Sequence, residues 1–210
     1  MLGCNIAALF NKKVRTMMRG HHDTWQILRR KIGTDHYVWF HAASLGEFEQ
    51  GRPLMEHLKR QHPEKKILLT FFSPSGYEVR KNYAGADVVC YLPFDTPFNA
   101  IKFVKLARPE EAYFIKYEFW RNYIDILHRN HIPVYSVSSI FRPNQIFFRW
   151  YGRNYARVLH RITHFYVQNE TSKKLLANIG VNQVTVVGDT RFDRVIDIRH
   201  AAKQIGRAHV

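Results

Sequence analysis

The chain alternates short β-branched or aromatic runs with longer helical patterns, and this alternation limits the possible folds more than any other feature. Seven runs predict strands, near residues 37–41, 67–72, 88–92, 112–116, 134–137, 165–168 and 184–187. Helical patterns separate them, near residues 47–61, 77–83, 97–107, 120–130, 146–161 and 171–179. Strict alternation predicts an α/β fold in which helices cover both faces of a parallel sheet.

Polar or glycine-bearing segments follow six of the seven predicted strands. Since ligands bind beyond the carboxyl ends of the strands in such sheets, we expect a binding site at this edge. The segments are residues 43–47, 73–76, 116–120, 138–142, 168–170 and 188–193.

Two carboxylates stand out in these segments, and the residues alone leave two interpretations open for each. Glu47 begins a helix, where the dipole favours the ionised form, so it is either a base that accepts a hydroxyl proton or an ordinary helix-start acid. Glu118 lies in apolar surroundings and needs a partner such as Arg142 or Arg191 to stay charged. A structural ion pair explains Glu118 as well as catalysis does.

The segment Ser73-Pro74-Ser75-Gly76 stands ahead of a predicted helix. Backbone N–H groups and two hydroxyls at a helix N-terminus predict an anion site, and the same residues also make an ordinary N-cap and turn.

The chain is strongly basic, with 32 Lys and Arg against 17 Asp and Glu, a formal net charge of +15. Its surface therefore attracts phosphates, nucleic acid or anionic lipid. Within the predicted helix 146–161, arginines recur every four residues among aromatic side chains. This stripe fits a nucleic-acid surface, an anionic leaflet or a solvated basic face. It consists of Arg149, Arg153, Arg157 and Arg161.

The first 19 residues carry an apolar stripe at helical spacing with cationic residues on the other faces. That pattern fits a helix lying at a membrane surface, and equally one packed on its own domain. The apolar run Ile6–Phe10 is far short of the roughly 20 residues that a spanning helix needs. Two cysteines, Cys4 and Cys90, are too few for a disulfide framework and favour a reducing, cytoplasmic setting.

The sequence lacks the usual metal and cofactor motifs. It has no Asp-x-Asp, no His-x-x-x-His with a facing carboxylate, no Gly-x-Gly-x-x-Gly and no phosphate loop. We therefore expect no metal and no cofactor, NAD and ATP included.

Six segments taken together resemble, in order and spacing, the motifs of the 3-deoxy-D-manno-octulosonic acid (Kdo) transferases. They are Trp39–Glu47, Leu69–Gly76, Tyr91–Asp95, Tyr117–Asn122, Gln168–Glu170 and Val187–Asp193. The resemblance implies the Rossmann-like, acceptor-binding N-terminal half of a two-domain GT-B glycosyltransferase whose other half binds CMP-Kdo. It implies an inverting, metal-independent transfer of Kdo to a lipid A precursor, in lipopolysaccharide inner core biosynthesis at the cytoplasmic face of the inner membrane.

The same resemblance implies roles for individual residues. Glu47 corresponds to the general base, and Glu118 and Arg191 to groups that stabilise the transition state. Arg191 stands where many relatives have lysine, Lys116 where an acid is common, and Arg121 where proline is common. We expect substrate contacts from the polar strand ends, at Ser44, Gly46, Ser73, Ser75, Gly76, Arg142, Gln168 and Asp189.

The expected organisation has a basic amphipathic segment at 1–36 that associates with an anionic membrane, followed by the acceptor-binding domain at 37–204. Residues 205–210 resemble the translation of a sequencing adapter and are set aside. The donor-binding domain is then absent, and we expect this fragment to be inactive. The expected partners are the lipid A precursor, CMP-Kdo and the membrane, with no nucleic acid. Two alternatives remain: a basic RNA-binding α/β module, and a two-domain glycosyltransferase with another donor.

Overall fold

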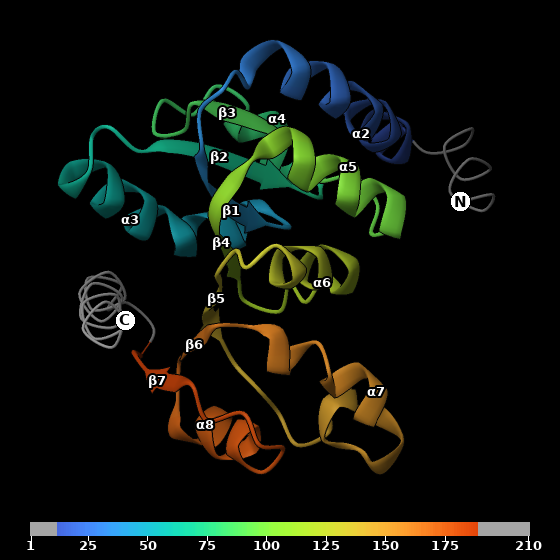
Figure 1. The fold of residues 1–210 in the computed structure, drawn as a ribbon, viewed down its shortest axis with the longest axis vertical. Coiled ribbons are helices and arrows are strands. Elements are labelled where there is room, and N and C mark those ends of the chain that lie inside the picture. The colour runs from blue at the N-terminus through green and yellow to red at the C-terminus, as the bar shows by residue number, and fades with distance from the viewer. Residues whose placement is uncertain (1–11, 189–210) are drawn as a thin grey trace.

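The computed structural model describes residues 12–188, which build one seven-stranded parallel sheet with helices on both faces (Figure 1). Along the sheet the strand order is β3-β2-β1-β4-β5-β6-β7. The strands are β1 (Tyr37–Ala42), β2 (Lys66–Phe71), β3 (Val88–Tyr91), β4 (Pro109–Ile115), β5 (Val134–Ser139), β6 (His164–Val167) and β7 (Val184–Val186). The predicted α/β fold and all seven predicted strands are confirmed.

The helices divide between the two faces of the sheet (Figure 1). They are α2 (Lys12–Lys31), α3 (Leu45–Gln61), α4 (Pro74–Arg80), α5 (Pro97–Ala107), α6 (Arg121–Arg129), α7 (Arg153–Ala156) and α8 (Glu170–Ala177). One core layer packs under α3 and α4, and the other under α2, α5, α6 and α8. Trp39 and Phe40, adjacent in β1, are both buried and point into opposite layers, as the pleat of a strand requires.

Local capping residues fix several helix ends. Helix α4 begins at Pro74, three residues before the predicted start, because Ser73 accepts a hydrogen bond from Ser75 N at 3.3 Å and proline suits the first turn. After α8, Gly180 takes φ +82° and its N–H donates to Ala177 O at 2.9 Å, a glycine conformation that ends helices.

The prediction of one helix over 146–161 is wrong. Three single turns of 3₁₀ helix, η1 (Ile146–Phe148), η2 (Trp150–Gly152) and η3 (Leu159–Arg161), flank the short α7. The chain folds back so tightly that a Cβ on Gly152 would lie 1.6 Å from Ile146 O. The continuous arginine stripe is therefore wrong too: Arg149 has an extended backbone, and Arg161 pairs with Asp125.

Helix α2 packs against the sheet through His21, Thr24 and Leu28, which are buried. Thr24 Oγ1 donates to Tyr91 O at 2.8 Å, which joins the helix to the end of β3. Among residues 12–188, no helix is long and apolar enough to span a bilayer. Cys4, Asp189, Arg191 and the segment 205–210 lie outside the described residues.

Candidate active site

The strand order reverses between β1 and β4, which are neighbours in the sheet although three helices and two strands separate them in the chain. Helix α3 follows β1 on one face, and α6 follows β4 on the other (Figure 1). Connections that leave in opposite directions open a crevice between them, and this is where ligands bind in open α/β sheets. The segments 43–47 and 116–120 border this switch point.

Glu47 lies in the first turn of α3, on the β1 side of the switch point. Its Oε2 accepts a hydrogen bond from Ala43 N at 2.5 Å, so the carboxyl group reaches back to the end of the strand. Burial, and then the charge of Glu118, raise the pKa of Glu47 to about 7, against the lowering effects of the Ala43 and Ser44 N–H groups and of Lys116. The expectation that the helix start keeps Glu47 ionised is therefore too simple, because burial outweighs the hydrogen bonds that the carboxyl group accepts there.

Glu118 lies on the β4 side of the switch point, with its side chain 15% exposed. Its Oε2 accepts a hydrogen bond from Trp120 Nε1 at 2.5 Å and lies 3.3 Å from His41 Nε2. The partners proposed from the sequence were arginines. Instead, Arg142 is exposed, and its backbone N–H donates to Gln145 Oε1. Arg191 falls beyond the described residues.

Two non-glycine residues at neighbouring strand ends have left-handed backbones: Lys116, at φ 62°, and Ser138, at φ 60°. Such conformations cost of the order of 1–3 kcal/mol and cluster at functional sites. Gln168 supports the second of them, since its Nε2 donates to Ser138 Oγ at 2.7 Å and to Ser138 O at 3.1 Å. The predicted site residue Gln168 therefore holds the end of β5 in place.

The remaining predicted contacts differ in what surrounds them. Ser73 caps α4, and its Oγ lies 3.0 Å from that of the exposed Ser75. Gly76 is a packing residue, because a Cβ there would lie 2.2 Å from the Phe71 ring. Ser44 precedes α3 without a side-chain cap hydrogen bond, and a Cβ on the exposed Gly46 would meet no atom within 4 Å. Ser44 and Gly46 therefore leave the β1 side of the crevice open.

Asp95, which was not among the predicted site residues, orients the segment that carries Glu118. Asp95 Oδ1 accepts hydrogen bonds from Asn122 N at 3.1 Å and Tyr123 N at 3.3 Å, and Asn122 Nδ2 donates to Asp95 O at 3.0 Å. A residue following β3 thereby caps the start of α6. No local signal pointed to this cap, because Asp95 stands before α5 in the sequence and reaches α6 only through the fold.

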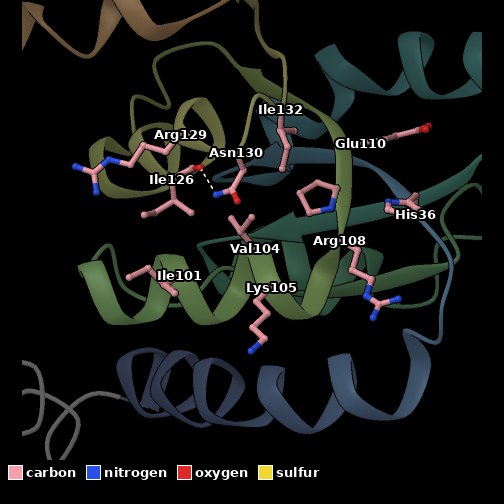
Figure 2. Close-up of a pocket in the computed structure, with 11 residues that line it drawn as sticks. His36, Ile101, Val104, Lys105, Arg108, Glu110, Ile126, Arg129, Asn130 and Ile132 are labelled. Atoms are coloured by element: carbon pink, nitrogen blue, oxygen red, sulfur yellow. Dashed lines mark hydrogen bonds between the residues drawn. The ribbon is translucent and has the colours of Figure 1, made fainter.

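A hollow of about 720 Å³ lies between α5 and α6 at the opposite, amino-terminal edge of the strands (Figure 2). Apolar side chains such as Val104, Ile126 and Ile132 line its centre, while the charged ends of Lys105 and Arg129 point away from it. The amide of Asn130 also lies near the centre, but its Nδ2 donates to Ile126 O at 2.7 Å, so the switch point with its two carboxylates remains the better candidate for chemistry.

Residues 15–194 match the protein family described as "3-Deoxy-D-manno-octulosonic-acid transferase (kdotransferase)". The chain belongs to the Kdo transferase family. The match includes every motif quoted above from Trp39 to Asp193, and with them both carboxylates of the switch point.

Individual Kdo transferases match over only part of their length. The enzyme named 3-deoxy-D-manno-octulosonic acid transferase in Aquifex aeolicus is 39% identical over 88 residues, or 41% of this chain and 24% of that protein. The one in Haemophilus influenzae is 27% identical over 162 residues, or 74% of this chain and 38% of that protein. The one in Bordetella pertussis is 26% identical over 179 residues, or 81% of this chain and 41% of that protein. The chain thus spans less than half the length of these Kdo transferases.

Solved structures agree on the fold. A UDP-GlcNAc 2-epimerase from Neisseria meningitidis has a TM-score of 0.56 at 15% identity, over 82% of this chain and 53% of the other. The enzyme of the same name from Methanocaldococcus jannaschii has a TM-score of 0.53 at 14% identity, over 73% of this chain and 45% of the other. The Kdo transferase chain therefore has a GT-B-like fold that corresponds to about half of these epimerases.

Proposed function

We propose that this chain is the acceptor-binding half of a glycosyltransferase that moves Kdo from CMP-Kdo to a lipid A precursor, in lipopolysaccharide inner core biosynthesis. The observation that carries the proposal is the pair Glu47 and Glu118 at the switch point of a Kdo transferase family fold, with the pKa of Glu47 raised to about 7. A carboxyl group with a pKa near the working pH is well matched to general acid–base catalysis.

In this mechanism Glu47 accepts the proton of the acceptor hydroxyl as that oxygen bonds to the anomeric carbon of Kdo. The bond from the anomeric carbon to the CMP phosphate oxygen breaks, and CMP leaves with the electron pair on the face opposite the attack, so the configuration inverts. Glu118 carries negative charge beside a centre that gains oxocarbenium character. Cationic side chains, with Arg191 as our candidate, offset the charge that accumulates on the leaving phosphate, and the transfer uses no metal or other cofactor.

The substrate contacts divide along the crevice in this proposal. Ser44 and Gly46 face the acceptor on the β1 side, since neither is occupied by packing or capping. Ser75 and Arg142 are exposed beyond the ends of β2 and β5, which lie on opposite sides of the switch point, and both suit the phosphates of a lipid A precursor. Ser73, Gly76 and Gln168 support the backbone around them, and Asp189 completes the proposed set.

We also propose that the enzyme lies peripherally on the cytoplasmic face of the inner membrane. Support comes from helix α5, which packs beside α2 (Figure 1) and exposes Phe98 by 72% and Ile101 by 54%. Cationic side chains accompany these apolar ones, with Lys102 Nζ lying 4.3 Å from the centre of the Trp25 ring. Apolar side chains flanked by lysines are typical of surfaces that bind anionic leaflets.

The test of the proposed function is Kdo transfer by the full-length gene product. Purified enzyme is given CMP-Kdo and a lipid A precursor, and the glycolipid product is measured by mass spectrometry. Transfer from CMP-Kdo is the expected result, and the 210-residue chain alone should give none, because one half cannot hold both reactants in register. Transfer only from a different donor nucleotide sugar would refute the proposal.

A further inference from the structure

A chain of buried hydrogen bonds runs from the interior of the sheet to Glu118. Trp39 Nε1 donates to Thr70 Oγ1 at 2.8 Å, and the same Oγ1 lies 2.9 Å from His41 Nδ1. On its other side the ring places Nε2 3.3 Å from Glu118 Oε2. Trp39, Thr70 and His41 are each 0% exposed, so bulk water does not compete for the two bonds among them.

The strand pairing sets the place of the His41 ring. His41 and Thr70 are direct partners in the β1–β2 ladder, and Trp39 lies two residues earlier on the same face of β1. Phe114 and Trp120 hold the ring edge-on, with centroids 5.8 and 5.5 Å away. His41 therefore presents Nε2 to Glu118 from a fixed position.

The donors and acceptors of this chain select one tautomer of His41. The Trp39 indole can only donate, so Thr70 Oγ1 accepts there and its own hydrogen is free to be donated. Its nearer acceptor is His41 Nδ1, at 2.9 Å, whereas Phe40 O is 3.3 Å away. A neutral ring that accepts at Nδ1 carries its hydrogen on Nε2.

The Glu118 side of the chain points to the same tautomer. Glu118 Oε2 already accepts the Trp120 indole N–H at 2.5 Å, which favours an acceptor oxygen without its own proton. His41 Nε2 is then the donor in this pair. In the opposite arrangement, a protonated Glu118 donates to Nε2, and the ring hydrogen lies on Nδ1. The experiment must distinguish these two tautomers.

We propose that His41 is a positioning residue for Glu118, held by Thr70 in the Nε2–H tautomer so that its donated hydrogen bond fixes the carboxylate at the switch point, facing Glu47. This inference rests on the proposed function, because the role of Glu118 comes from it. The other charged or titratable groups close by are Lys116, beside Glu47, and His21 of α2, beside His41.

The first test reads the tautomer in the 210-residue chain labelled with ¹⁵N-histidine. Long-range ¹H–¹⁵N correlation near neutral pH should show His41 protonated on Nε2 and bare on Nδ1. Thr70→Ser keeps the hydroxyl and should preserve this pattern. Thr70→Val removes the hydroxyl, should weaken the tautomer preference, and should lower the titration midpoint of Glu47 by roughly half a pH unit or more as Glu118 loses its fixed place.

Two results would overturn the inference. One is a ring hydrogen on Nδ1 in the unmutated chain. The other is a folded Thr70→Val chain whose His41 tautomer and Glu47 midpoint equal those of Thr70→Ser. Neither result depends on which sugar the enzyme transfers, so the proposed function could fail while this test succeeds.

The second test uses the full-length enzyme and separates turnover from binding. His41→Gln retains an N–H group that can reach Glu118, whereas His41→Phe does not. We expect His41→Phe to lower kcat by roughly tenfold or more, with the KM for the lipid acceptor nearly unchanged, and His41→Gln to recover much of the loss. A folded His41→Phe enzyme with unmutated kcat would refute the positioning role, and an unmutated enzyme that transfers no Kdo would refute the function instead.

Discussion

The charge of Glu118 raises the pKa of Glu47 across the point where the strand order of the sheet reverses. Glu47 lies in the first turn of α3 and Glu118 in the loop before α6, and these two connections leave the sheet toward opposite faces, so only the fold brings the residues together. Burial contributes more than the charge does, and the two effects together hold the pKa of Glu47 at about 7. Ionised Glu47 therefore destabilises the folded chain, and this loss of stability can be measured without any substrate.

We predict that Glu47→Gln stabilises the 210-residue chain at alkaline pH. The folded-state pKa of Glu47, about 7, lies above its ordinary value of 4.5, so the folded protein binds this proton more tightly than the unfolded protein does. The resulting stability is complete below about pH 4.5 and is lost as the pH rises through about 7. Melting temperatures should therefore favour Glu47→Gln at pH 8 and converge with those of the unmutated chain in acid. A variant that melts lower than the unmutated chain at pH 8 would contradict the raised pKa.

Asp95→Ala should destabilise the chain by about 1–2 kcal/mol, because the N–H groups of Asn122 and Tyr123 at the start of α6 lose their acceptor. Asp95→Asn should recover part of this loss. As a matched control, Asp35→Ala removes an exposed ion pair with Lys66 and should cost clearly less than Asp95→Ala, because solvent screens the pair. Urea unfolding measures all three, and equal losses for Asp95→Ala and Asp35→Ala would rule out the cap.

Most of the fold could be predicted from the sequence, since strand and helix periods differ and every strand lies within a few residues of its predicted range. The failure at 146–161 has a local cause. Arginine and aromatic spacing suggested one helix, but spacing does not reveal that Gly152 lets the backbone pass against Ile146 O.

The sequence predicted which residues belong to the site, but not which of them contact or influence one another. Glu47 and Glu118 could be chosen because they follow strands. Their shared environment depends on the order of β1 and β4 in the sheet, which no local pattern encodes. The link from Thr70 to His41 likewise depends on strand register. Both residues lie in segments that carry the family resemblance, but no local pattern pairs them.

Alanine substitutions at two glycines should affect stability very differently. Gly152→Ala should lower the free energy of unfolding by about 2 kcal/mol or more, because its Cβ would collide with the carbonyl oxygen of Ile146. Gly46→Ala should stay within about 0.5 kcal/mol of the unmutated chain, since its Cβ meets no atom within 4 Å. In the full-length enzyme, however, Gly46→Ala should raise the KM for the acceptor. An unchanged KM would remove Gly46 from the proposed contacts.

Binding to anionic vesicles should depend on the exposed apolar side chains of α5. The double variant Phe98→Ser with Ile101→Ser removes side chains that are 72% and 54% exposed, and should reduce co-sedimentation with phosphatidylglycerol vesicles several-fold. Tyr155→Ser, at a side chain 56% exposed on α7, serves as the control and should leave binding near normal. Deletion of residues 1–20 should also reduce binding. Unchanged sedimentation of both the double variant and the deletion would refute the membrane proposal.

The most direct test of the account is single-turnover Kdo transfer by the full-length enzyme with Glu47→Gln. Glutamine keeps the shape of the side chain but cannot accept the hydroxyl proton, so the chemical step should slow by roughly 10²-fold or more while acceptor binding changes little. Glu56→Gln is the control on the same helix, because the side chain of Glu56 is 45% exposed and pairs with Arg52 at the surface. A folded Glu47→Gln enzyme that transfers Kdo as fast as Glu56→Gln would contradict the assignment of Glu47 as the general base.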